Sequence, residues 1–437
     1  MSMIDRAGNG EGSSDRGRWG IAIVSDLHLS RGCHPHAPGH ALHDGGFARF
    51  LGHLRRRAAK RPSSWRLVIL GDLIDLPHAS GPPTETVAEL TRVAADHPRL
   101  FEALGEFLAA GLEVDVVAGN HDIALLRRAV RERFADLVLA GASNAGVRGR
   151  LAVHPWIFHV PGVLYAEHGS QYHDIARVPE LLGLDGTDDR RPAGRPLMAE
   201  LERYLRGLGE RRAGAASRAA VLLGVGQESL RFAGAVTGHA FTRSSSQAAR
   251  QRAAYQALTL RRYAAEVGIT HDALVGIDEL TVASAWSIAG RLARTWIVGP
   301  SARAARGLVP RRGPRLRPLW QPTDRAAYLR SAWPVVHHFL CAAGQAVPFY
   351  VFGHTHYPEE LALADGTTRY LNAGSWQSTP QSPAALRGTF VEITGEPGAT
   401  RPVARLLRWD DEAGQPEPVL ALARTSSAPG PWPWRKS

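Results

Sequence analysis

The sequence predicts an α/β protein built on parallel strands and interrupted by a long, mainly helical insertion. Over residues 20–175, short β-branched runs alternate with stretches of helical period, which is the pattern of successive βαβ units. After residue 176 the chain becomes rich in Ala, Arg and Leu, and strand character returns only near residue 347. At 437 residues the chain has room for one large domain with such an insertion, or for two to three ordinary domains.

Seven strands are expected, four before the insertion and three after it. The first four read IAIVSD, RLVILGD, LEVDVVAGN and GVLYAEHG, at residues 21–26, 66–72, 112–120 and 162–169. Apolar residues at helical spacing lie between them, as in Phe47, Phe50, Leu51 and Leu54. The last three strands are expected at 347–353, 368–374 and 389–394. In sheets of this kind, functional residues gather at the carboxyl ends of the strands.

Composition divides the chain into five segments. We expect a disordered start, the first part of the α/β domain, the helical insertion, the second part of the domain and a loose tail, at residues 1–19, 20–175, 176–345, 346–412 and 413–437. The polar first segment lacks the apolar core of a signal peptide, and the chain has no apolar run of 18 residues. A cytoplasmic protein is therefore expected.

The cysteine content and the charge distribution exclude some classes of protein. Cys33 and Cys341 are the only cysteines and lie far apart in the chain, so neither a disulfide framework nor a cysteine-based zinc site is expected. Apolar residues make up 44% of the chain and charged residues 21%, which is typical of globular proteins. The net charge of +11 is concentrated in residues 176–345, which hold 25 arginines against 13 acidic residues.

The basic insertion has two interpretations. Helical surfaces are often charged and solvated, and the apolar stripe that contains Val282, Trp286 and Trp296 fits a helix that packs on the rest of the protein. Alternatively, this stripe belongs to a lid that meets acyl chains or a membrane interface, with arginines near lipid phosphates. The sequence leaves both open.

Five polar motifs follow predicted strands. They are SDLHL, GDLID, GNHD, EHGSQYHD and FGHTHYP, at 25–29, 71–75, 119–122, 167–174 and 352–358. Taken singly, each has an ordinary reading as a turn or a helix cap. The intervals from Asp26 to Asp72, from Asp72 to Asn120 and from Asn120 to His168 are 46, 48 and 48 residues, each about one strand, one crossover and the next strand. Adjacent strand ends would therefore bring these side chains together.

The motifs supply ligands for borderline metals. A mixed set of carboxylate, imidazole and amide oxygen suits Mn²⁺, Zn²⁺ or iron rather than a metal that prefers thiolates. Two metals need a shared anionic ligand, and a carboxylate has the oxygen atoms to bridge them. Asp72 is the natural candidate for that position.

The ordered motifs D-x-H, G-D-x-x-D, G-N-H-D, H and G-H-x-H resemble the calcineurin-like metallophosphoesterases over about residues 20–175 and 347–410. The segment LNAGSW at 371–376 is similar to a late motif of bacterial members. The resemblance implies a two-sheet α/β/β/α sandwich with the helical insertion as a cap. The HGSQYHD segment departs from a subgroup pattern, because His173 intervenes before Asp174.

The resemblance also implies the residue roles and the reaction. One metal would be held by Asp26, His28, Asp72 and His356, and the other by Asp72, Asn120, His168 and His354. His121, oriented by Asp75, would donate a proton or hydrogen bond to phosphate. The implied enzyme hydrolyses a phosphate ester or pyrophosphate by attack of a hydroxide that bridges two divalent ions, with Mn²⁺ favoured and Zn²⁺ or iron open.

Several substrate classes and secondary features stay open. Bacterial UDP-2,3-diacylglucosamine pyrophosphatases share the D-x-H motif and a helical insertion, which suggests a lipid-linked substrate and peripheral membrane contact. A DNA-processing nuclease would explain the arginines through phosphate contacts, although no aromatic stacking platform is present. The histidine-rich loop 31–44 is expected to be an exposed loop near substrate rather than a further metal site, and His337 and His338 are expected to be packing or helix-end residues.

Overall fold

A computed structural model of the chain provides the architecture. It describes residues 18–31, 42–60, 63–76, 83–140, 145–173, 176–178, 181–184, 259–292, 326–363, 365–377, 386–396, 399 and 401–419. The expected disordered start, most of the insertion, the far end of the tail, Asp174, and His34, His36 and His40 of the 31–44 loop lie outside these residues, as does the side chain of His43. The side chains of the predicted 281–298 stripe, from Val282 onward, also lie outside them.

The first sheet has seven strands in the order β12-β11-β10-β1-β2-β3-β4. Their bounds are β1 (Arg18–Val24), β2 (Ser63–Leu70), β3 (Glu113–Val117), β4 (Leu151–His154), β10 (Thr389–Gly395), β11 (Val403–Asp410) and β12 (Gln415–Pro418). Strands β1 to β4 are parallel, and Val24 pairs with Ile69 next to the ends of β1 and β2. The loops that follow these strands therefore leave the sheet at one edge.

The second sheet has five strands in the order β5-β6-β7-β9-β8. Their bounds are β5 (Ile157–Val160), β6 (Leu164–Glu167), β7 (Phe349–Phe352), β8 (Glu359–Ala362) and β9 (Arg369–Asn372). Strands β6, β7 and β9 are parallel, and Glu167, Phe352 and Asn372 stand side by side at their ends. This register aligns the HGSQYHD, GHTH and LNAGSW segments, which come from distant parts of the chain.

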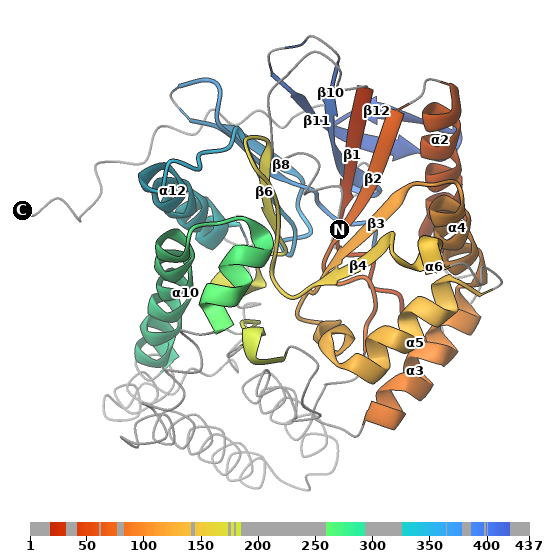
Figure 1. Cartoon of the computed structure of the whole chain (residues 1–437), viewed down its shortest axis with the longest axis horizontal. Coiled ribbons are helices and arrows are strands. Elements are labelled where there is room, and N and C mark those ends of the chain that lie inside the picture. The colour runs from red at the N-terminus through yellow and green to blue at the C-terminus, as the bar shows by residue number, and fades with distance from the viewer. Residues whose placement is uncertain are drawn as a thin grey trace, which may run out of the picture.

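Helices cover the outer face of each sheet, and the two sheets face each other (Figure 1). Against the first sheet lie α2 (Phe47–Lys60), α3 (Pro83–Asp96), α4 (Pro98–Ala109), α5 (Arg128–Val138) and the short α6 (Ala145–Arg148). Beside the second lie α10 (His271–Leu292) and α12 (Ala327–Ala342). The described residues also include single turns, η1 (Leu42–Gly46), η2 (Ile123–Leu126), η3 (Ser170–Tyr172) and η4 (Leu181–Leu184), and a helical stretch over residues 259–267. The predicted α/β/β/α sandwich is confirmed.

The core has a layer between the sheets and layers beneath the helices. In β1, Ile21 and Ile23 face the second sheet, whereas Ala22 and Val24 face the helices, because successive strand side chains point to opposite faces. Both sets are at most 5% exposed. Burying each large aliphatic side chain contributes roughly 1.5–3 kcal/mol, so the strand ends rest on a rigid platform.

The structure adds strands that the sequence did not predict. Strands β8 and β12 read EELA and QPEP, and both lie at sheet edges, where one neighbour suffices and no apolar alternation is required. The tail predicted at 413–437 is therefore wrong in its first residues, because β12 pairs with β11. Within the described residues, no helix is long and apolar enough to cross a membrane.

Candidate metal centre

The predicted ligands lie in the loops at the carboxyl ends of five strands from both sheets. Asp26 and Asp72 follow β1 and β2, and the amide of Asp26 donates to the carbonyl of Gly71 at 3.1 Å. His168 follows β6 in the second sheet, and its carbonyl accepts the amide of Gly353, which follows β7, at 3.1 Å. Backbone hydrogen bonds thus fix these loops in pairs before any side chain is considered.

An unusual backbone conformation marks the same residues. Among the described residues, five that are not glycine have positive φ: Asp26 (55°), His28 (50°), Asp72 (52°), His354 (65°) and His356 (58°). All five belong to the predicted ligand set. Such conformations are costly for residues with a Cβ atom and cluster at functional sites. The strand ends are therefore turned sharply, so that these side chains converge.

Three motif glycines permit close approach between the loops. A Cβ atom at Gly71 would lie 2.4 Å from the His168 ring, and one at Gly119 would lie 2.2 Å from Oδ1 of Asp72. A Cβ atom at Gly353 would lie 1.9 Å from Oγ of Ser25. The glycines of the GD, GN and GH motifs are thus required by packing as well as by turn geometry.

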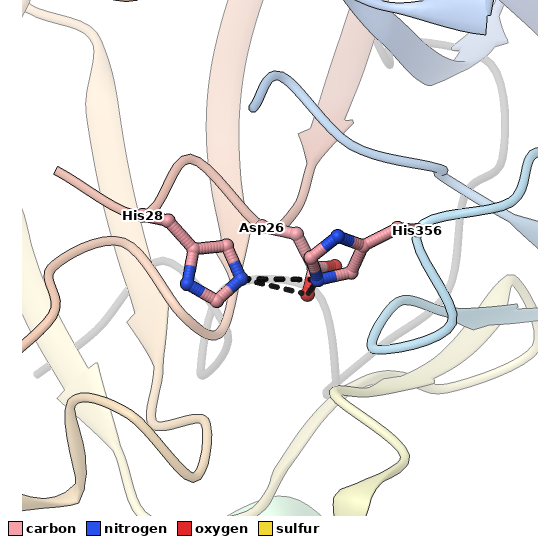
Figure 2. Close-up of side chains that lie close together, drawn as sticks. All are labelled: Asp26, His28 and His356. Carbon is pink, nitrogen blue, oxygen red and sulfur yellow. Dashed lines mark hydrogen bonds and ion pairs between the residues drawn. The ribbon is translucent and has the colours of Figure 1, made fainter. Parts of the chain in front are cut away.

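One ligand cluster consists of Asp26, His28 and His356, whose side chains point toward one another (Figure 2). Nε2 of His28 lies 3.0 Å from Nε2 of His356 and 3.7 Å from Oδ1 of Asp26, and Nε2 of His356 lies 3.2 Å from that oxygen. Burial raises the pKa of Asp26, but His356 and His28 outweigh it and hold the pKa below its usual range. A carboxylate facing two imidazole nitrogens is the donor set of a metal site.

The hydrogen-bond partners of the Asp26 carboxylate indicate that a cation would fit beside it. Its Oδ2 accepts hydrogen bonds from Ser25 and from the amide of His354, at 2.5 and 2.8 Å. Its Oδ1, which faces the histidines, is buried and has no hydrogen-bond partner within the described part of the chain. A buried anionic oxygen without a donor is costly, and a divalent ion would satisfy it.

A second ligand cluster consists of Asp72, His168 and His354, with Asn120 beside them. Nε2 of His168 lies 3.3 Å from Oδ2 of Asp72, 3.2 Å from Oδ1 of Asn120 and 3.2 Å from Nδ1 of His354. Nδ1 of His168 donates to the carbonyl of Leu70 at 2.8 Å, which turns Nε2 toward the cluster. Despite burial, Asp72 raises the pKa of His168 to about 9, so the local field favours a cation.

Asp72 lies between the two clusters. Its Oδ2 is 3.7 Å from Nε2 of His28 in one cluster and 3.3 Å from Nε2 of His168 in the other. Its Oδ1 accepts the amide of His121 at 2.8 Å. The side chain expected to bridge two metals therefore reaches ligands of both predicted sets.

His121 and Asp75 are also placed together, as the motifs predict. Nδ1 of His121 lies 2.8 Å from Oδ1 of Asp75, and the His121 side chain is 37% exposed. Nδ1 of His28 lies 2.8 Å from the same oxygen, a contact that the sequence analysis missed. Burial opposes ionisation of Asp75, but the hydrogen bonds from His121 and His28 prevail and lower its pKa.

Further residues that support the site were not singled out from the sequence. Asp122, the last residue of GNHD, accepts the amides of Leu73 and Gly119 at 2.7 Å each and so ties two ligand loops together. Burial and the nearby charge of Asp72 raise the pKa of Asp122 to about 6. In the sequence, the sign of this supporting role was the position of Asp122 within the GNHD motif.

The LNAGSW segment also holds the ligand loops. Asn372 donates to the carbonyl of Gly353 at 2.8 Å, and Oγ of Ser375 donates to the carbonyl of Asp26 at 2.9 Å.

Two further histidines of the sequence analysis have side-chain contacts. His337, expected to be a packing residue, contacts the Tyr350 hydroxyl at 2.8 Å. His173 lies against His354, with ring centroids 5.2 Å apart.

Comparison with known proteins matches part of the chain to a family. Residues 20–206 match the family model of the calcineurin-like phosphoesterases. The chain carries a calcineurin-like phosphoesterase domain. This match spans the first four motifs, and the structure adds His354 and His356, which follow β7, to the same site. The domain is that of a metal-dependent hydrolase acting on phosphoester bonds, and its clusters hold His and Asp side chains able to bind metal.

Comparisons with whole proteins add little to the phosphoesterase assignment. A search of curated protein sequences found no match. A phosphopantetheinyl hydrolase from Mycobacterium tuberculosis, a solved structure, is 13% identical with a TM-score of 0.25, over 86% of this chain and 95% of that one. A likeness at that level says nothing about the substrate of this chain.

Proposed function

We propose that the chain is a binuclear phosphoesterase that hydrolyses a phosphate ester or a pyrophosphate. The observation that carries this proposal is the position of Asp72, whose Oδ2 faces His28 of one cluster and His168 of the other. A carboxylate between two sets of borderline ligands is the arrangement that a two-metal site requires. A single-metal site would leave one cluster without a role.

The proposed ligand sets follow the two clusters. Asp26, His28, Asp72 and His356 hold one ion, and Asp72, Asn120, His168 and His354 hold the other. The donor set favours Mn²⁺, with Zn²⁺ or iron as alternatives. Two such ions supply Lewis acidity toward phosphoryl oxygens and lower the pKa of bound water.

The protein's own proton donor in this proposal is His121. Asp75 accepts from its Nδ1, so Nε2 is the atom available to the substrate. The side chain is 37% exposed, in contrast to the buried His168, and a substrate can therefore reach it. His121 would protonate or hydrogen-bond the leaving oxygen, a contribution of roughly 10²- to 10⁴-fold in rate.

Substrate and partner remain proposals that a screen can separate. A phosphorylated small molecule or lipid-linked substrate is favoured, with peripheral membrane contact through the arginine-rich insertion, in a cytoplasmic protein. A DNA-processing nuclease is the second candidate, but most of the insertion lies outside the described residues, and no observed contact favours nucleic acid.

The test is hydrolysis of phosphomonoesters, phosphodiesters and pyrophosphates by the Mn²⁺-supplemented protein, with Asp72→Asn as the blank. We expect turnover of at least one class by the wild type and none by the variant. Elemental analysis should find two metal ions per wild-type chain. One ion per chain with full activity would refute the binuclear site.

A further inference from the structure

Helix α12 is fixed against the second sheet close to the two ligand clusters. Its Leu329 is fully buried and packs on Gly169, where an added Cβ atom would lie 3.1 Å away. Trp333 stacks on Tyr370, with ring centroids 5.7 Å apart and planes at 26°. Arg330 forms an ion pair with Glu359 at 2.6 Å. The first turn of this helix is thus held rigidly beside the site.

That turn carries Tyr328 to the cluster containing His354. The Tyr328 ring lies 6.2 Å from the His354 ring and 5.1 Å from that of His173, which itself lies 5.2 Å from His354. The amide of Ala176 donates to Nδ1 of His173 at 3.2 Å and fixes that ring. Tyr328 and His173 therefore form a wall beside one metal cluster.

The hydroxyl of Tyr328 differs from those of the buried tyrosines. Each of these hydroxyls has a hydrogen-bond partner, in Tyr165, Tyr172, Tyr263, Tyr350 and Tyr370. Tyr328 is partly buried, and no residue that the structure describes bonds to its hydroxyl. A partly buried tyrosine hydroxyl usually finds a hydrogen-bond partner, so a ligand oxygen is the natural one here.

Tyr328 and His121 lie beside different ligand clusters. The His121 ring lies 4.7 Å from that of His28, which belongs to the Asp26 cluster. Tyr328 lies beside His354, which belongs to the Asp72 cluster. If His121 serves the leaving oxygen, a donor above the other cluster would contact a different oxygen of the same phosphoryl group.

We propose that Tyr328 is a substrate-binding residue, whose hydroxyl donates a hydrogen bond to a non-bridging phosphoryl oxygen at the cluster of Asp72, His168 and His354. This inference rests on the proposed phosphoesterase function. It assigns the start of α12, which lies outside the matched family region, to the binding site. Substrate recognition then draws on both the catalytic loops and the end of the inserted segment.

The test compares Tyr328→Phe with Tyr350→Phe. The second variant removes a hydroxyl of β7 that is bonded to His337, a residue of α12 like Tyr328. Titration calorimetry with inorganic phosphate and the Mn²⁺-loaded protein should show about tenfold weaker binding for Tyr328→Phe, as expected for one hydrogen bond to a charged group. KM should rise by a similar factor with kcat little changed. Tyr350→Phe should bind phosphate as the wild type does, and metal content should be unchanged in both variants.

The outcomes separate the two proposals. Wild-type phosphate affinity and KM in Tyr328→Phe, or a fall in kcat alone, would overturn the role of Tyr328 while leaving the phosphoesterase intact. If the wild type binds phosphate but hydrolyses nothing, the proposed function fails, and the calorimetric comparison still decides whether Tyr328 binds phosphate. Failure of the wild type to bind phosphate would overturn both.

Discussion

His28 and His121 are coupled through a single oxygen atom, because Oδ1 of Asp75 lies 2.8 Å from Nδ1 of each ring. One carboxylate therefore orients a proposed metal ligand and the proposed proton donor together. The rings themselves meet edge to face, 4.7 Å apart. A change at Asp75 should thus affect metal binding and catalysis at once.

Asp75→Asn should weaken metal binding about 10- to 100-fold, the usual effect of losing a residue that orients a ligand histidine. Activity should fall further, because His121 loses its orientation as well. Metal titration beside hydrolysis rates would measure both effects. Asp115→Asn is the matched control, since Asp115 pairs with His154 at 2.7 Å within the strands, away from the clusters. Equal metal affinity in the Asp75 variant and the wild type would contradict the coupling.

His121→Ala should lose hydrolysis by roughly 10²- to 10⁴-fold but keep its metals, because the proposed function makes this side chain a proton donor and not a metal ligand. Asp72→Asn should lose both, since its carboxylate reaches both clusters. Elemental analysis of the purified variants, together with rates, separates the two roles. A metal-free His121→Ala protein would show that this histidine is a ligand instead.

Gly71→Ala should destabilise the protein and disturb the Asp72 cluster. Gly71 has φ of 84°, and a Cβ atom there would lie 2.4 Å from the His168 ring. Gly111→Ala is the matched control, because Gly111 has φ of 87° but no atom within 4 Å. The control should lose only the conformational term of about 1–2 kcal/mol. Denaturant unfolding and metal titration would test this, and equal metal affinity in both variants would count against the clash.

Glu167 predicts a pH dependence of stability. It is fully buried, with Trp156, Tyr165 and Tyr172 as donors, and burial raises its pKa from 4.5 to about 7 despite those hydrogen bonds. A raised carboxyl pKa means that the folded state holds the proton more tightly than the unfolded state. The contribution of protonated Glu167 to the free energy of unfolding is therefore complete below pH 4.5 and is lost as the pH rises through about 7.

The measurement is the unfolding free energy of wild type and Glu167→Gln, both with chelator, from pH 4.5 to 8. The stability of the wild type relative to the variant should fall by about 3 kcal/mol over that interval, since each pKa unit corresponds to 1.36 kcal/mol. The lowered pKa values of Asp26 and Asp72 act in the opposite direction at acidic pH, but they are common to both proteins and cancel. A constant difference between the two proteins would contradict the prediction.

Much of the fold was predictable because the strands of a buried sheet are recognisable locally. The runs around β1, β2 and β3 are apolar and β-branched, and the predicted segments overlap the observed strands. Strands β1 and β2 end before their motifs, in which Asp26 and Asp72 take a positive φ that is incompatible with a continuing strand. Strands such as β8 and β12 lack an apolar pattern, since pairing with one neighbour, rather than burial, defines them.

The sequence by itself determined which residue types stand at the strand ends and in what order, because motif glycines, carboxylates and histidines are local features. Tertiary structure alone decided how they share partners. The contact of Asp75 with His28, the link from Asp122 to Leu73, and the approach of Tyr328 to His354 join distant segments. Such contacts depend on strand register and loop backbone angles, which arise only when both sheets pack. For that reason, the chemistry was readable from the chain, whereas its geometry required the fold.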